Sequence, residues 1–175
     1  MDTTYAGIIR DGPSRTLSLV KNGTGSLTLS GTNLYTGATA VSNGTLCVNG
    51  SLATSSVTVS PGSGFAIGAT GVVARASLAG TLTFKDSSRL LVDVQPPVAD
   101  AVSASGNVVI GSGVELRLSG DQTHSGGQWK VVESTGGTVS GSFVLVGGLK
   151  NTKLIQTANA VWLTIPPKGT LLLFL

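Results

Sequence analysis

Residues 19–46, LVKNGTGSLTLSGTNLYTGATAVSNGTL, decide the fold, because they place short strand patterns between glycine-rich turns in a unit the size of one solenoid coil. Polar and apolar residues alternate over residues 26–30, so one face of this strand can be buried while the other meets water. A second strand pattern at 39–41 reaches a third at 45–48 through Ser42-Asn43-Gly44, a turn whose Asn and Gly suit positive φ. A repeat of strand and turn without an intervening helix predicts a β-solenoid.

The same residues carry the motifs of a known repeat. They resemble the passenger-associated transport repeat, also called the autotransporter-associated β-strand repeat, of secreted bacterial passenger domains. The matching motifs are GTGxLTLSG at residues 23–31, NxYTG at 33–37 and GTL at 44–46. Leu34 and Ala38 stand where the family often has a Thr and a second Gly, and both residues are compatible with a β-coil.

Later segments are similar to the later coils of such passengers. The likeness lies in residues 80–84, 90–94, 129–132 and 136–143. The resemblance implies a right-handed parallel β-helix displayed on the outside of a bacterium, and it implies no chemistry. At roughly 20 to 25 residues per turn, the chain would form about seven to eight coils. We therefore expect an all-β fold in a single domain over residues 1–175.

The composition of the chain independently indicates an ordered all-β protein. Charged residues make up 11% of the sequence, against a usual share of about 25%, and none occurs between Lys21 and Arg75. Strong β propensity with few charges favours folded structure over disorder. The net charge of +3 comes from basic residues scattered singly, without a basic run or interleaved aromatics, so we expect no nucleic-acid partner.

Two intervals interrupt the strand pattern, and both are predicted to project from the solenoid as loops. Residues 95–106 contain Pro96-Pro97, which cannot donate ladder hydrogen bonds, followed by a stretch without glycine. Residues 120–128 contain His124 among several glycines and polar residues.

The C-terminal segment, residues 169–175, is more apolar than the rest of the chain. Its candidate self-association residues are Leu171, Leu172, Leu173, Phe174 and Leu175. They are too few to span a bilayer, which takes about 20 residues, and too many to leave in water. Three interpretations stay open: a terminal strand or cap over the open end of the solenoid, a junction with a second copy, or the cut end of a longer protein.

The sequence contains no signal for its own export. Residues 1–4 lack the basic and apolar regions of a signal peptide, and no pattern of membrane-barrel strands follows the solenoid. We expect an extracellular or bacterial cell-surface location, reached after removal of a signal peptide, as a fragment of a longer autotransporter, or by another route.

The chain offers few residues for catalysis or metal binding. Its single cysteine, Cys47, is predicted to be a buried small side chain, and His124 is the only histidine, so no histidine cluster can bind zinc. Asp93 is predicted to point outward alone. The alternative places Asp93 one coil from Glu115, or Glu115 one coil from Glu133, as an acid and base pair. We expect no cofactor, no metal ion and no enzymatic activity.

Aromatic side chains are the candidates for a ligand-stacking surface, because a flat exposed ring can hold a sugar. Trp162 lies between Val161 and Leu163 in an alternating strand, so it faces away from the core if those two residues face inward. The other candidates are Trp129, Tyr5 and Tyr35.

Three functions are compatible with these patterns. The leading hypothesis is a non-enzymatic extracellular structural solenoid that acts as a stalk or adhesin-type passenger module. A related hypothesis is a subunit that assembles end to end into fibres through residues 171–175. The alternative is a glycan-binding or glycan-cleaving β-helix with host or matrix glycans or proteins as partners, which would need exposed aromatics or converging carboxylates.

Overall fold

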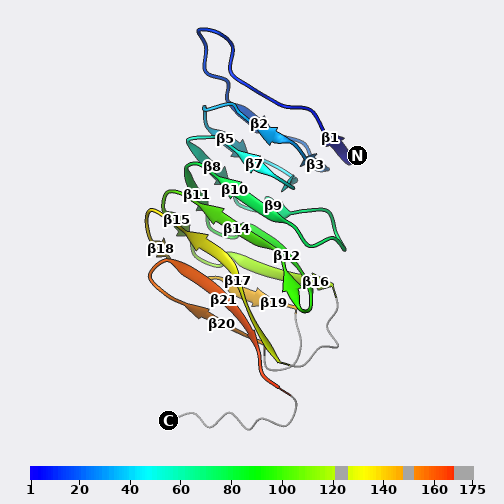
Figure 1. The fold of residues 1–175 in the computed structure, drawn as a ribbon, viewed down its shortest axis with the longest axis vertical. Coiled ribbons are helices and arrows are strands. Elements are labelled where there is room, and N and C mark those ends of the chain that lie inside the picture. The colour runs from blue at the N-terminus through cyan, green and yellow to red at the C-terminus, as the bar shows by residue number, and fades with distance from the viewer. Residues whose placement is uncertain (121–125, 148–151, 168–175) are drawn as a thin grey trace.

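The structure, a computed structural model, describes residues 1–120, 126–147 and 152–167. Within these residues the chain forms 21 strands and no helix. Figure 1 shows the strands stacked in successive coils along one long axis, with the N-terminus at one end. The described part of the chain therefore contains no helix that is long and apolar enough to cross a membrane.

The strands form three sheets that run along the axis. In spatial order, the first sheet contains β1 (Thr3–Tyr5), β3 (Ser26–Leu29), β6 (Thr45–Val48), β9 (Gly64–Ile67), β12 (Arg89–Gln95), β16 (Glu115–Gly120) and β19 (Val144–Val146), with β13 (Val98–Ala99) paired to β12. From the C-terminal end, the second contains β18 (Val139–Ser140), β15 (Val108–Ile110), β11 (Thr81–Phe84), β8 (Ser56–Val59), β5 (Thr39–Val41) and β2 (Leu19–Lys21). The third contains β20 (Lys153–Gln156), β21 (Ala160–Ile165), β17 (Gly127–Ser134), β14 (Ala101–Ala104), β10 (Arg75–Leu78), β7 (Ser51–Leu52) and β4 (Thr32–Asn33).

The chain visits the second, first and third sheets in turn, and as far as β19 each new coil pairs in parallel with the coil before it. Leu46 is the register partner of Phe65, 19 residues later (65 − 46), and Phe65 is the partner of Leu90, 25 residues later (90 − 65). The widest spacing among the parallel pairs of the described strands is 31 residues, between Val108 and its partner Val139 (139 − 108). This stacking in register confirms the predicted parallel β-helix.

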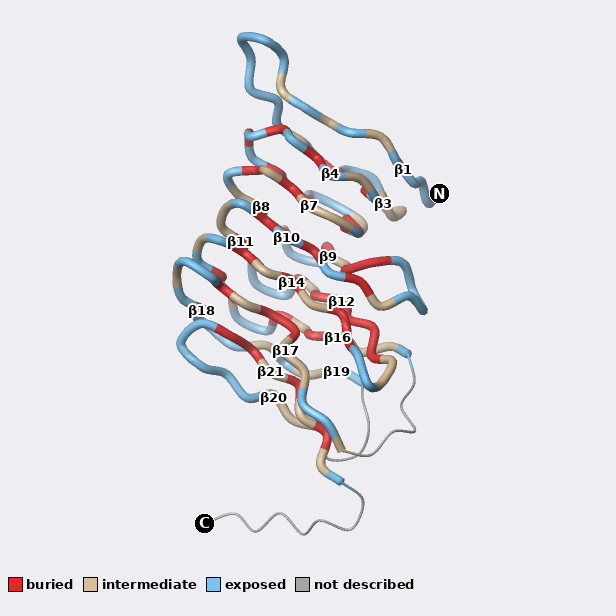
Figure 2. Tube along the Cα trace, viewed as in Figure 1, coloured by how far each residue is buried: buried red, intermediate tan, exposed pale blue. Residues whose placement is uncertain are grey.

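The core lies between the three sheets and continues through the coils, as the buried segments of Figure 2 show. Leu46, Phe65 and Leu90 are register partners on the inner face of the first sheet, and each has no exposed surface. Phe84 of the second sheet has its ring centroid 6.5 Å from that of Phe65 and 5.5 Å from that of Phe143, both edge to face. The apolar residues of neighbouring coils are thus packed against one another rather than only within a coil.

Lys21, in β2, holds the corner between two coils. Its side chain is buried, and Nζ donates to the carbonyl oxygens of Gly23 at 2.7 Å, Asn43 at 3.0 Å and Asn22 at 3.3 Å. Gly44 follows with φ at +69°, and a Cβ there would lie 2.4 Å from the carbonyl oxygen of Gly23. The close approach of the two turns therefore requires glycine at this position.

The prediction that residues 95–106 form a projecting loop is wrong for most of the interval. β12 continues to Gln95, reverses at Pro96-Pro97 and pairs antiparallel with β13, and the chain then enters β14. Val102 and Ala104 are buried in β14, because alternation places them on the inner face of the third sheet. Only the turn at the two prolines interrupts the strands.

The last described strands depart from the parallel pattern. β17 pairs antiparallel with β21, and β21 pairs antiparallel with β20, so a hairpin extends the third sheet at its C-terminal end. β17 begins at Gly127, inside the second interval predicted as a loop, whereas residues 121–125 lie outside the described residues. The apolar segment 169–175 also lies outside them.

Candidate functional site

The outer face of the third sheet carries a line of polar side chains. Ser51, Ser77, Ser103 and Glu133 are successive register partners on β7, β10, β14 and β17. Neighbouring strands lie about 4.8 Å apart, so these groups repeat regularly along the axis. Their alternating neighbours, including Leu52 of β7, are buried. The strand period therefore places a hydroxyl line on the solvent side of the sheet.

A groove of about 420 Å³ crosses the C-terminal half of this line. It is lined by Ser77 and Ser103, by Arg75 at the start of β10 and by Trp129 near the start of β17. Pro97, at the turn of the β12–β13 hairpin, lines the same groove. Part of the groove lining therefore comes from a hairpin of the first sheet.

Trp129 is held at the edge of this groove by the hairpin. Its indole Nε1 donates a 2.9 Å hydrogen bond to the carbonyl oxygen of Pro97, and its ring is half-buried against the core. Gly127 lies directly beneath, because a Cβ at that position would lie 2.3 Å from the ring. The hydrogen bond and the close packing fix the orientation of the indole.

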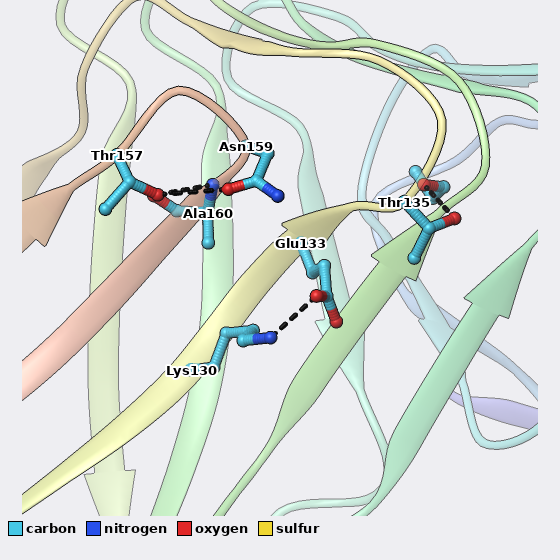
Figure 3. A network of polar contacts seen from close by, with 7 residues as sticks. Lys130, Glu133, Thr135, Thr157, Asn159 and Ala160 are labelled. Carbon is cyan, nitrogen blue, oxygen red and sulfur yellow. Dashed lines mark hydrogen bonds and ion pairs between the residues drawn. The ribbon is translucent and has the colours of Figure 1, made fainter.

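β17 also carries an ion pair, between Lys130 and Glu133. Their Nζ and Oε1 atoms are 2.6 Å apart, as Figure 3 shows, and both side chains are partly exposed. The Lys130 ammonium also lies 5.2 Å from the ring centroid of Trp162 on the neighbouring strand β21. This cation–π contact covers part of the indole ring of Trp162.

The aromatic residues proposed as a ligand-stacking surface differ in burial and in their neighbours. Val161 and Leu163 are buried, so Trp162 faces outward as the alternation predicts, but Lys130 lies over its ring. Trp129 lies at the groove. The proposal that Tyr35 belongs to a stacking surface is wrong, because its ring is fully buried and its hydroxyl is 2.7 Å from Thr39 Oγ1.

Tyr5 is exposed on β1, on the first sheet, and does not line the groove. It therefore cannot act together with Trp129 on one ligand of modest size.

The carboxylates suggested as catalytic neighbours do not converge. Glu115, on the first sheet, is the register partner of Arg89, whereas Asp93 lies further along β12. Glu133 is on the third sheet and pairs with Lys130. Glu115 instead lies 2.6 Å from the guanidinium Nε of Arg117, and both of these side chains are exposed enough to meet solvent.

The prediction that Asp93 points outward alone is also wrong. Its carboxylate is buried, with Oδ2 accepting a hydrogen bond from the backbone N–H of Gly71 and Oδ1 accepting one from the Ser119 hydroxyl. Asp100 is buried beside it, and its two oxygens accept from the N–H groups of Ala74 and Asp93, both at 2.7 Å. The connection between β9 and β10 covers these carboxylates, a contact between coils that strand alternation does not reveal.

The buried position of Asp100 alters its ionisation. Burial raises the pKa of its carboxyl to about 6, and the charge of Asp93 acts in the same direction, against the hydrogen bonds from the backbone. Neither aspartate forms an ion pair with a described residue. The pair therefore holds a loop in place through backbone hydrogen bonds.

Cys47 is buried, as predicted, under the same connection, with Sγ against the carbonyl oxygen of Gly68. Burial raises the pKa of its thiol, which keeps the thiol protonated and unreactive. In the described part of the chain, no three His, Cys, Asp or Glu side chains gather as metal ligands. His124 and the candidate self-association residues 171–175 lie outside that part.

The sequence patterns did not single out Arg75, Ser103 or Lys130, and they suggested Glu133 only as an acid and base partner of Glu115. Each is an ordinary polar residue on an alternating strand, and only the stacking of coils brings them into one groove. The one sequence signal nearby is the pair of prolines that turns the hairpin over the sheet.

The repeat identified from the sequence is confirmed by comparison with known families. A family model described as Passenger-associated-transport-repeat matches residues 19–48, which span β2 to β6. No curated protein matches the chain. Together with the stacked parallel sheets, the repeat in residues 19–48 indicates an autotransporter passenger β-helix, with the extracellular or surface location that this family implies.

Proposed function

We propose that this chain is a structural segment of an extracellular or cell-surface protein, a rigid solenoid that acts as a stalk or adhesin-type passenger module and catalyses no reaction. The observation that carries the proposal is the continuity of the first sheet, which runs through β1, β3, β6, β9, β12, β16 and β19 without a break. Parallel ladders of this kind resist bending, because every coil is hydrogen-bonded to the coils on either side.

Rigidity along the axis can be measured by electron paramagnetic resonance with two spin labels. Thr4 and Arg117 are joined by an unbroken series of register partners over five strand spacings, which corresponds to about 24 Å at about 4.8 Å each. The labels are placed at Thr4→Cys and Arg117→Cys in a Cys47→Ala background. A single narrow distance distribution is expected, and a broad one would contradict a stalk role.

The non-enzymatic part of the proposal draws support from the separation of Glu115 and Glu133 on different sheets. Glycan cleavage by paired carboxylates needs the two groups to flank one bond. Incubation with a panel of neutral and acidic polysaccharides, followed by assay of reducing ends and unsaturated products, tests it. Catalytic turnover on any of them would contradict the proposal.

End-to-end assembly into fibres is the second part of the proposal. The apolar residues 171–175 motivate it, and the N-terminal end offers an acceptor, since β2 is an edge strand of the second sheet and Val20 on it is 64% exposed. An unpaired strand edge with an exposed apolar residue favours addition of another strand.

Sedimentation and negative-stain microscopy over a wide range of concentration test the assembly. The intact chain is compared with a chain truncated after Pro167 and with Val20→Lys, which places a charge on the acceptor edge. Fibres that both changes abolish are expected. Intact protein that stays a monomeric short rod at every concentration would show that residues 171–175 do not join copies.

A glycan-binding role is a second candidate function. The groove on the third sheet favours it, because the groove combines an aromatic ring, hydroxyl groups and charged side chains on one exposed face.

A further inference from the structure

The groove on the third sheet carries an excess of positive charge. Its ionisable side chains are Arg75, Lys130 and Glu133, of which the last two form an ion pair at 2.6 Å. The guanidinium of Arg75 is exposed and makes no hydrogen bond or ion pair with any residue that the structure describes. A guanidinium without a partner favours a ligand with a carboxylate, which it binds through two parallel hydrogen bonds.

The hydroxyl groups of the groove follow a repeat that suits a linear polymer. Ser77 and Ser103 are register partners on neighbouring strands, and Ser51 continues the line toward the N-terminal end. The strand spacing of about 4.8 Å is close to the length of one sugar ring in an extended chain. A glycan lying along the solenoid axis can therefore present one ring to each strand.

Trp129, near the start of β17, supplies an apolar surface beside this line, whereas Glu133 is the next register partner after Ser103. The Trp129 ring lines the groove, and the hydrogen bond from Nε1 to Pro97 holds it in place before any ligand arrives. Aromatic rings contact the apolar faces of sugars, and a ring that is already fixed loses little conformational entropy on binding. Trp162 is less suited, because the ammonium of Lys130 lies over its ring.

We propose that this groove binds a linear acidic oligosaccharide built of uronic acid residues. Arg75 binds a carboxylate of the ligand, Ser77 and Ser103 exchange hydrogen bonds with its ring hydroxyls, and Trp129 contacts the face of a sugar. The proposal deepens the adhesin element of the proposed function and rests on it for the surface location. An acidic peptide is the competing ligand, and it lacks the flat apolar ring face that Trp129 would contact.

The test is calorimetric titration of the intact chain with tetragalacturonate, and in parallel with a neutral galactose tetrasaccharide. Saturable binding of the acidic chain is expected, with affinity at least about 10-fold above that for the neutral chain. Arg75→Gln is expected to weaken binding by about 10-fold or more. Arg15→Gln is the matched control, because Arg15 is an exposed arginine outside the groove and its loss should leave binding unchanged.

Tryptophan fluorescence distinguishes the two indoles. Tetragalacturonate is expected to change the emission of the wild type and of Trp162→Phe, and to change that of Trp129→Phe much less. These two conservative variants keep an aromatic ring at each position, so a folded protein is retained for the comparison.

Three outcomes would overturn the proposal. They are the absence of saturable binding of tetragalacturonate at millimolar concentration, equal weakening by Arg75→Gln and Arg15→Gln, and equally tight binding of tetraglutamate. None of these bears on the spin-label distance or on fibre formation, so failure of the groove proposal is distinguishable from failure of the structural role.

Discussion

Raising the pH from 5 to 7 should destabilise this protein, because folding buries the carboxyl of Asp100. The side chain is 1% exposed, its neighbours include the carboxylate of Asp93 and the thiol of Cys47, and burial raises its pKa from 3.8 to about 6. A carboxyl with a raised pKa binds its proton more readily in the folded state than in the unfolded chain. Its contribution to stability is therefore present below about pH 4 and is lost as the pH rises through about 6.

The size of the effect follows from the shift of 2.2 pKa units (6 − 3.8) for Asp100. At about 1.4 kcal/mol per unit, full ionisation lowers the free energy of unfolding by about 3 kcal/mol across the whole window. Between pH 5 and pH 7 the free energy of unfolding is expected to fall by about 1 kcal/mol. The rest of the loss has already occurred by pH 5, because Asp100 is largely ionised in the unfolded chain at that pH. The hydrogen bonds from the N–H groups of Ala74 and Asp93 favour the ionised carboxyl, and the pKa of about 6 already includes their effect.

The assay is urea unfolding at constant ionic strength from about pH 4.5 to about pH 7.5, with the wild type and Asp100→Asn compared. The lower limit avoids the ionisation of Asp11. Hydrogen bonds from Leu17 and Thr36 lower the pKa of this carboxyl, so its contribution to the stability of the protein is lost as the pH falls. His124→Gln is the control, because histidine is the residue type whose ordinary pKa lies in this pH range and His124 is the only histidine in the sequence. Asp100→Asn should remove this pH dependence. The lost acceptor costs about 1 kcal/mol relative to the wild type with Asp100 protonated, so the difference between the two proteins should change as the pH rises.

Either of two results would refute this reasoning about Asp100. One is a wild-type protein whose free energy of unfolding rises between pH 5 and pH 7. The other is an Asp100→Asn variant that retains the wild-type slope, which would assign the pH dependence to another group.

The other predictions concern stability and use the same urea assay. Lys21→Met should lower the free energy of unfolding by about 1–3 kcal/mol, because three carbonyl oxygens lose their donor; an unchanged value would mean that water replaces the ammonium. Phe84→Leu should cost about 1–3 kcal/mol by removing two edge-to-face contacts, and a loss below about 0.5 kcal/mol would contradict the role of this ring between coils. Leu29→Asp should unfold or aggregate the chain, as its side chain is fully buried, and a soluble native variant would show that the inner face of β3 is assigned wrongly. Reversing the charge of Glu115 or Arg117 should change stability by under about 0.5 kcal/mol, since both are partly exposed, and a loss of several kcal/mol would place them in a buried contact.

The sequence by itself determined the fold class, the repeat and the inner faces of the strands. Leu29, Leu46 and Leu116 occupy alternating positions between turn residues, and all three are fully buried. Alternation is a local property that each strand carries in its own residues, so it survives without knowledge of the neighbouring coil. The motifs of residues 19–46 likewise lie within a single short stretch, which made the repeat visible.

Only the tertiary structure decided which polar groups are buried and which meet. Asp93 has the outward position that alternation assigns, yet the connection after β9 covers it and supplies the N–H of Gly71. The groove with Arg75 and Trp129 depends on a hairpin from the first sheet reaching over the third. These contacts join residues about one coil apart or more, and the coils differ in length, so no fixed spacing in the sequence marks them.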